Sequence, residues 1–123
     1  MGSPVTHWQV LTTRPEVVQE FYAALFGWQV RDDNTLGYKL VDTGTREGIS
    51  GGLWPISPAE GRSMVQLFVR VADVRAHVKQ AEALGGKIII PTQTLPSGDE
   101  MAVITDPDGV PFAIFKGTGN LPL

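Results

Sequence analysis

Residues 7–27 read HWQVLTTRPEVVQEFYAALFG, and residues 66–86 read QLFVRVADVRAHVKQAEALGG. Each stretch begins with β-type residues and continues with apolar residues at three- and four-residue spacing, a pattern that predicts a strand followed by a helix. Both stretches end in glycine, which readily takes the left-handed conformation that terminates a helix. The sequence therefore predicts one strand–helix unit used twice, at a constant offset of 59 residues.

The expected boundaries of these elements come from turn and capping residues. In the first stretch, residues 5–12 are predicted to form a strand, and Thr13-Arg-Pro-Glu16 a capping box before the helix. Its apolar positions are Val17, Val18, Phe21, Tyr22 and Leu25. In the second stretch, residues 65–71 are the predicted strand and Asp73 the N-cap. The stripe expected to be buried is Val74, Val78, Ala81 and Leu84.

Three short β-type runs follow each predicted helix, separated by turn residues. They are residues 28–30, 37–41 and 49–54 after the first helix, and 87–90, 101–104 and 111–115 after the second. The element order is therefore βαβββ, twice. Module one spans about residues 5–54 and module two about residues 64–116. Residues 55–63 are the linker, and a linker this short indicates one packed domain over residues 1–123.

Composition excludes several functions. The 123 residues are 42% apolar, which suits one ordinary core. A net charge of −3 with scattered basic residues offers no binding surface for nucleic acid or an anionic membrane. Since a membrane-spanning run and a signal peptide are absent from the sequence, we expect a cytoplasmic protein. The chain has no cysteine, so disulfides, thiolate metal sites and cysteine nucleophiles are excluded.

Three segments carry a family resemblance. His7-Trp-Gln-Val10, Phe21-Tyr-Ala-Ala-Leu-Phe-Gly-Trp28 and Asp106-Pro-Asp-Gly-Val-Pro-Phe-Ala-Ile114 resemble the vicinal oxygen chelate superfamily. That superfamily includes glyoxalase I, extradiol dioxygenases, and the bleomycin- and fosfomycin-resistance proteins. The resemblance covers about residues 5–116 and implies an α+β fold. In that fold, two tandem βαβββ modules form a curled mixed-sheet cup with flanking helices, and ligands bind inside the cup.

The resemblance also identifies the positions of possible metal ligands. Metal-dependent members hold a divalent ion with one residue from the first strand and one from the last strand of each module. His7 and Gln66 fall on the first-strand positions, whereas Ala113 and the segment Ser50-Gly-Gly-Leu53 fall on the last strands. A catalytic divalent site needs about three strong protein donors. We therefore expect no metal cofactor, with His7 and Gln66 as the donors if one binds. Glyoxalase I activity is disfavoured because the last-strand carboxylate that takes the proton is missing.

Strand alternation divides the side chains into two faces. If His7 faces the cup, Gln9 and Leu11 do so too, and Trp8 and Val10 pack under the helices. The residues expected behind the cup in module two are Val65, Leu67, Val69 and Val71. The predicted ligand-binding residues are His7, Gln9, Gly51, Gly52, Trp54, Gln66, Phe68, Arg70, Ala113 and Phe115. This partly apolar set suits a small organic molecule. Arg70 is either a partner for a carboxylate or phosphate or a solvated charge at a strand end.

Other polar and glycine motifs have simpler interpretations. His77 is expected on the solvated face of its helix. Asp106-Pro-Asp-Gly109 has the residue order of a tight turn. Gly51-Gly52 is too short for a phosphate loop and is not followed by a helix. These two glycines are expected to let a ligand or a neighbouring strand approach the backbone closely.

Two functional hypotheses follow. The first is a metal-independent binder of a small organic molecule, which sequesters its ligand without turnover. The second is an enzyme of isomerase, transferase or dioxygenase type, with His7 as general base or as ligand of a weakly held divalent metal. In either case we expect a homodimer, because a curled open sheet leaves strand edges and apolar rims to cover.

Overall fold

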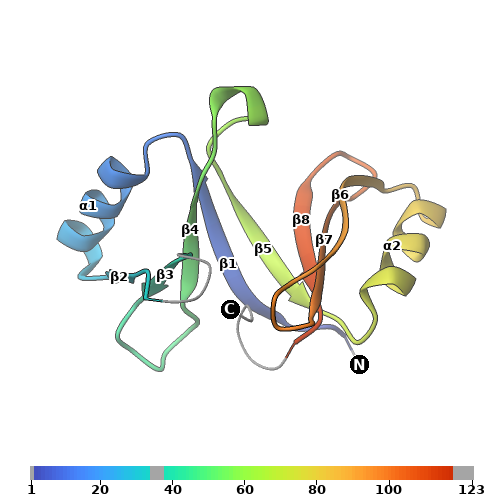
Figure 1. The fold of residues 1–123 in the computed structure, drawn as a ribbon, viewed down its shortest axis with the longest axis horizontal. Coiled ribbons are helices and arrows are strands. Elements are labelled where there is room, and N and C mark those ends of the chain that lie inside the picture. Colours follow the sequence, from blue (N-terminus) through green and yellow to red (C-terminus); the bar gives the residue numbers. More distant parts are fainter. Residues whose placement is uncertain (1, 34–37, 118–123) are drawn as a thin grey trace. The chain divides into compact units, whose positions relative to one another are not determined.

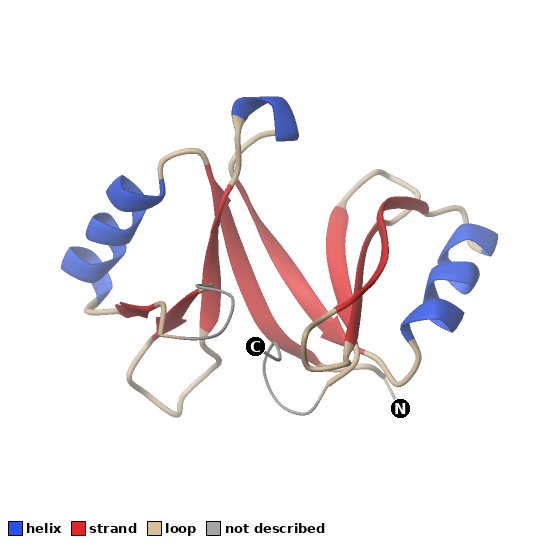
Figure 2. Cartoon of the chain, viewed as in Figure 1, coloured by secondary structure: helices blue, strands red, loops and turns tan. Residues whose placement is uncertain are grey.

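The computed structural model describes residues 2–33 and 38–117 (Figure 1). Module one contains β1 (Val5–Thr12), α1 (Pro15–Phe26), β2 (Gln29–Arg31), β3 (Lys39–Asp42) and β4 (Gly51–Pro55). Module two contains β5 (Met64–Arg70), α2 (Val74–Ala83), β6 (Lys87–Thr94), β7 (Glu100–Thr105) and β8 (Pro111–Phe115). A short 3-10 helix, η1 (Pro58–Glu60), lies in the linker. The predicted α+β fold with a duplicated βαβββ order is confirmed (Figure 2).

The described residues form two compact units, divided after Thr6 in β1 and after Gln66 in β5. The units match the two modules except at the start of the chain and at residues 64–66 of β5, which group with module one. There the backbone carbonyl of Pro4 accepts a hydrogen bond from the N–H of Arg70 at 2.9 Å. Whether residues 1–123 behave as one packed domain stays a prediction. Within the described ranges, the helices are too short and too polar to cross a membrane.

Module one has the strand order β2-β3-β4-β1, with β1 and β4 parallel and the other neighbours antiparallel. Helix α1 lies beside these strands (Figure 1). The core on the helix side consists of Trp8, Val10, Val18, Tyr22, Trp28, Val30, Val41 and Leu53. The prediction that Trp8 and Val10 pack under the helix is therefore confirmed.

Module two repeats this arrangement with the order β5-β8-β7-β6, in which β5 and β8 are parallel. The core under α2 consists of Val71, Val74, Val78, Ala102, Ile104 and Ile114, with Val69, Ala81 and Phe112 packed against it. A second buried cluster consists of Phe68, Val103, Ala113 and Phe115, with Met101 packed against it. Because alternate residues of one strand point to opposite faces, these two clusters bury both faces of β7 and β8.

Two predicted helix ends are confirmed. Gly27 follows α1 with φ 71°, and its N–H donates a hydrogen bond to the carbonyl of Ala23 at 3.0 Å. The Asp73 side chain accepts a hydrogen bond from the N–H of Ala76 at 3.1 Å at the start of α2. Local capping chemistry therefore sets these two ends.

The predicted capping box at Thr13–Glu16 is wrong. Arg14 is the N-cap of α1 and makes no side-chain capping hydrogen bond. Its N–H donates instead to Oγ1 of Thr12 at 3.0 Å. Pro15, with its fixed φ, opens the helix without a side-chain cap.

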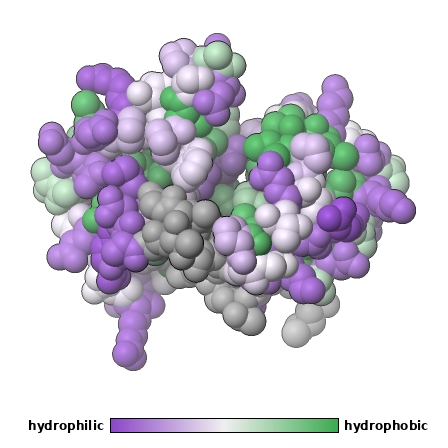
Figure 3. Space-filling view, in the orientation of Figure 1, coloured by the Kyte–Doolittle hydropathy of each residue, from purple (hydrophilic) through white to green (hydrophobic). Residues whose placement is uncertain are grey.

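Several predicted core positions are exposed. Val65 and Leu67 are 60% and 51% exposed, so they do not pack behind the sheet as predicted. Leu84, predicted in the buried stripe of the second helix, is 70% exposed, and the apolar Val17, Phe21 and Leu25 of α1 are exposed too. Figure 3 shows apolar side chains, in green, at the molecular surface. Each apolar stripe in the sequence therefore includes residues that the core of its own module does not bury.

The remaining local predictions concern strand ends and a turn. Strand β6 is longer than the predicted residues 87–90, and Gly37 of the predicted strand 37–41 lies outside the described residues. Asp106 caps the predicted turn, since its Oδ1 accepts hydrogen bonds from the N–H groups of Asp108 and Val110 at 2.9 and 3.0 Å. Asp106-Pro-Asp-Gly109 is thus a structural turn, as predicted.

Candidate functional site

A buried polar cluster lies in module one, on the face of β1 opposite the helix-side core. His7 is 1% exposed and Tyr38, which directly precedes β3, is 3% exposed. The Tyr38 hydroxyl lies 3.3 Å from Nε2 of His7 and donates a hydrogen bond to Oε1 of Gln9 at 2.5 Å. One hydroxyl group thus links two side chains that alternate along β1 on the same face.

Gly52 supplies the space for this hydroxyl. It lies opposite Gln9 in the parallel pairing of β1 and β4. A Cβ atom at Gly52 would lie 1.8 Å from the Tyr38 hydroxyl oxygen. That distance is far below any real contact, so Tyr38 occupies the volume that a side chain at residue 52 would need.

At Gly51 the side-chain position points to the opposite face of β4, towards the core under α1. A Cβ atom here would lie 2.2 Å from Cδ2 of Trp8, a residue of the core under α1. The expected close approach at Gly51-Gly52 is therefore made by two aromatic side chains of the chain itself. Trp8 fills the side of Gly51 on which a side chain would lie, and the role of Gly51 in ligand binding stays a prediction.

Trp54 lies on the same face of β4 as Gly52, at the more exposed end of the strand. Its ring centroid lies 5.7 Å from that of Tyr38, with the planes tilted by 32°. Trp54 is 42% exposed and lies opposite the half-buried Leu11 in the strand register. An accessible aromatic surface therefore lies beside the buried polar cluster.

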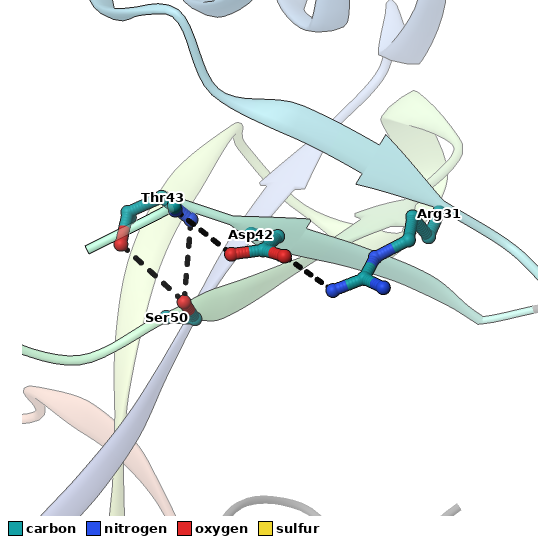
Figure 4. A network of polar contacts seen from close by, with 5 residues as sticks. Arg31, Asp42, Thr43 and Ser50 are labelled. Atoms are coloured by element: carbon teal, nitrogen blue, oxygen red, sulfur yellow. Dashed lines mark hydrogen bonds and ion pairs between the residues drawn. The ribbon is translucent and has the colours of Figure 1, made fainter. Parts of the chain in front are cut away.

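A polar network holds the loop that leads into β4 (Figure 4). The Asp42 carboxylate pairs with Arg31 across β2 and β3 and accepts a hydrogen bond from the N–H of Gly44 at 2.8 Å. The Thr43 N–H donates to Oγ of Ser50 at 3.3 Å. The exposed ion pair stabilises little by itself. The Thr43–Ser50 bond joins the two ends of the loop and so holds the start of the strand that carries Gly52.

Burial keeps His7 and Tyr38 uncharged. It lowers the pKa of His7 from 6.5 to about 4 and raises the pKa of Tyr38 above its ordinary value. Since the Tyr38 hydroxyl donates its single proton to Gln9, its oxygen accepts from Nε2 of His7. Nε2 therefore carries the imidazole proton at neutral pH.

This donor set does not fit a divalent metal ion. The last-strand positions hold Gly52 and Ala113, which lie opposite Gln9 and Phe68 in equivalent registers and offer no side-chain ligand. The Nε2 atom of His7 donates a proton to Tyr38 and so has no lone pair for a metal, which leaves Nδ1 as the one His7 atom that could bind a metal. In residues 2–33 and 38–117 there is no group of three or more His, Cys, Asp or Glu side chains placed to hold a metal.

Gln66, the other predicted donor, is buried in β5. It is 7% exposed, and its Nε2 lies 3.8 Å from Sδ of Met64. A neutral amide is a weak metal ligand compared with a carboxylate or an imidazole. Gln66 therefore adds little to the case for a metal.

The remaining predicted residues lie in module two. Phe68, Ala113 and Phe115 are at most 1% exposed and form part of its second buried cluster. The Phe68 and Phe115 rings meet edge to face at 6.0 Å. Arg70 is half-buried at the end of β5. Of the predicted set, His7, Gln9, Gly52 and Trp54 are the residues brought together in module one.

Sequence analysis missed Tyr38, the residue that organises this cluster. Tyr38 falls within the predicted strand 37–41, a run that carries no predicted site residue. The available signal was the Gly51-Gly52 pair, since two adjacent glycines in a strand leave room for a large side chain on each face.

The lowered pKa of His7 predicts a pH dependence of stability. In the unfolded chain the imidazole has its ordinary pKa of 6.5, whereas in the folded protein the pKa is about 4. Below about pH 6.5 the unfolded state therefore binds a proton that the folded state excludes. The free energy of unfolding should fall by about 3 kcal/mol between about pH 6.5 and pH 4.

Urea unfolding at several pH values in this range measures the effect. In His7→Gln, whose amide can still bond to Tyr38, this part of the pH dependence should be absent. The carboxyl groups titrate in both proteins, so the difference isolates His7. Identical pH profiles for the two proteins would contradict the prediction.

The contact between Gly52 and Tyr38 predicts strong coupling. Gly52→Ala should lower the free energy of unfolding by about 3 kcal/mol, because the new methyl group overlaps the Tyr38 hydroxyl. In a Tyr38→Ala background the same change should cost at least about 1 kcal/mol less. The control pairs Gly52→Ala with Val78→Ala in the α2 core, where the two costs should add. Additive costs with Tyr38→Ala would show that the two residues do not compete for space.

Comparisons with known proteins agree with this architecture. Residues 8–115 match the family model of the glyoxalase-like domain. "Putative glyoxylase CFP32" of Mycobacterium tuberculosis is 27% identical over 111 residues, 88% of this chain, and the chain spans 42% of that protein's length.

Solved structures show the same fold. A hypothetical protein from Bacillus halodurans C-125 has a TM-score of 0.68 at 11% identity, over 100% of both chains. Methylmalonyl-CoA epimerase from Mycobacterium tuberculosis, a vicinal oxygen chelate protein, has a TM-score of 0.64 at 15% identity, over 96% of this chain and 88% of its own. With the family model matched over most of its length, this chain belongs to the glyoxalase-like domain family.

Proposed function

We propose that this chain binds a small organic molecule without a metal ion, and that the surface around Trp54 in module one contacts the ligand. The observation that carries the proposal is the position of Tyr38. Its hydroxyl fills the space above Gly52 and is hydrogen-bonded to His7 and Gln9. This supports a metal-independent site, because the space beside the last-strand position of module one is taken by the Tyr38 hydroxyl.

The accessible groups near the cluster suit a flat, partly apolar ligand. Trp54 offers an exposed aromatic ring, and Leu11 beside it is half-buried. The half-buried Gln9 uses its Oε1 to accept from Tyr38, which leaves its amide N–H groups to donate to a ligand. One apolar platform with one polar group is typical of a site that orients a small molecule.

The enzymatic alternative has less support. A general base works best when its pKa lies near the working pH. The pKa of His7 is about 4, and the side chain is 1% exposed. Its imidazole is therefore a weak base at neutral pH, held away from solvent. The proposal accordingly predicts affinity without turnover.

Metal analysis tests the first half of the proposal. Protein purified without an affinity tag is mixed with nickel, cobalt, manganese, zinc or iron(II), and the melting temperature is recorded for each. We expect no stoichiometric binding and no rise in melting temperature. His7→Ala and His77→Ala form a matched pair, since His77 bonds to the backbone carbonyl of Asp73, the N-cap of α2. Stoichiometric binding lost in His7→Ala and kept in His77→Ala would overturn metal independence.

Ligand screening tests the second half. Flat aromatic fragments are screened by ligand-observed NMR against the wild type, Trp54→Ala and Leu84→Ala. Leu84 is also an exposed apolar residue, but it lies in module two. Fragments that bind the wild type should lose at least about tenfold in affinity in Trp54→Ala, equivalent to about 1.4 kcal/mol. Hits that bind all three proteins equally would place the ligand elsewhere.

The expected homodimer also stays a proposal. Val17, Phe21 and Leu25 recur at four-residue spacing along α1 and are 49%, 58% and 58% exposed. An exposed apolar stripe of this kind is typical of an interaction surface. Phe21→Glu should convert a dimer into a monomer in light-scattering measurements. Ala23→Glu, which adds the same charge to another face of α1, should leave the dimer intact. A monomeric wild-type protein would refute the proposal.

A further inference from the structure

Module two contains a hollow that the proposed function does not use. It has a volume of about 460 Å³ and is lined by Arg70, Val71, Ala72, Asp99, Lys116 and Gly117. These residues follow or end the parallel strands β5 and β8, or precede β7. Two backbone hydrogen bonds fix the walls. The N–H of Val71 donates to the carbonyl of Phe115 at 2.8 Å, and that of Lys116 donates to the carbonyl of Glu100 at 2.9 Å.

The hollow has excess positive charge. Neither Arg70 nor Lys116 takes part in the ion pairs of the described residues, which join Arg31 to Asp42 and Arg75 to Glu100. The backbone of Glu100 bonds to that of Lys116, but the Glu100 carboxylate pairs with Arg75 of α2.

Asp99, the acidic residue that lines the hollow, has a hydrogen-bond partner of its own outside the hollow's lining. Asp99 accepts a hydrogen bond from the Ser97 hydroxyl at 3.3 Å. Two cationic side chains and one carboxylate therefore line the hollow, which leaves one net positive charge.

The βαβββ architecture does not require these charges. In module one, Leu11 lies opposite Trp54, just as Arg70 lies opposite Phe115 in module two. Pro55, the next residue after Trp54, takes the place of Lys116. Both positions are uncharged in module one. The two cations at the ends of β5 and β8 are therefore a property of this sequence, not of the fold.

We infer that this hollow binds a small oxyanion, a carboxylate or a phosphate. The Arg70 guanidinium can bond both oxygens of such a group at once, and Lys116 adds a second, more mobile charge. Arg70 is half-buried, and its backbone is held by the carbonyl of Pro4, so its side chain starts from a fixed position. Asp99 then faces any hydroxyl or amine that the same molecule carries. The inference is independent of the Trp54 surface, because all of its residues lie in module two.

Titration with sodium phosphate and, separately, with sodium acetate tests the inference. Binding is followed by NMR shifts of backbone amides at constant ionic strength. We expect saturable binding of at least one anion, with shifts centred on residues 70–72 and 116–117. Arg70→Gln should weaken binding by about tenfold or more, the effect of losing a hydrogen bond to a charged group. Asp99→Asn, which removes the negative charge, should strengthen it. Lys79→Gln removes a cation from the exposed face of α2 and should have no effect.

The two probes separate the possible ligands. Binding of acetate alone identifies carboxylates as the ligand class, and binding of phosphate alone identifies phosphates. Absence of saturable binding by both anions would overturn the inference. Equal weakening in Lys79→Gln and Arg70→Gln would also overturn it, because the attraction would then come from the overall charge. Neither result bears on ligand binding at Trp54.

Discussion

The candidate site depends on one steric constraint, the absence of a side chain at Gly52. A buried tyrosine hydroxyl is stable only if it finds hydrogen-bond partners. Tyr38 finds them in Gln9 and His7, and it reaches them through the volume that a Cβ at Gly52 would occupy. The same arrangement leaves residue 52 without a side chain, fills the space beside it and places the imidazole proton of His7 on Nε2. These consequences are coupled, because each follows from where one hydroxyl group lies.

Duplication of the βαβββ module gives each position a counterpart with different chemistry. Gln9 and Gly52 pair in module one as Phe68 and Ala113 pair in module two. The first pair belongs to a polar cluster and the second to a fully apolar one. The two modules therefore share the same strand pairing, while the side chains at equivalent positions differ in polarity. For this reason, family membership identifies the positions to inspect but does not assign their function.

The sequence predicted the fold well because its signals are local. Strand alternation, helical spacing and the glycine after α1 each depend on neighbouring residues, and the element order followed from them. Burial was harder to predict, because it depends on what covers a side chain. Phe21 and Leu67 are as apolar as the core residues, yet 58% and 51% of their surfaces are exposed. Tyr38 was missed for a similar reason: its partners lie in β1 and β4, which are distant in the sequence.

The protonation states in the cluster limit the chemistry that module one can perform. Proton transfer needs a group whose pKa lies near the working pH. Burial has moved the pKa of His7 below neutral pH and the pKa of Tyr38 further above it. Two neutral, mutually bonded side chains can still orient Gln9 and support the ring of Trp54. Under the proposed function, recognition in module one rests on the groups that keep exposed surface, the indole ring of Trp54 and the amide of Gln9. Under the same proposal, such groups select a ligand by its shape and by one or two hydrogen bonds.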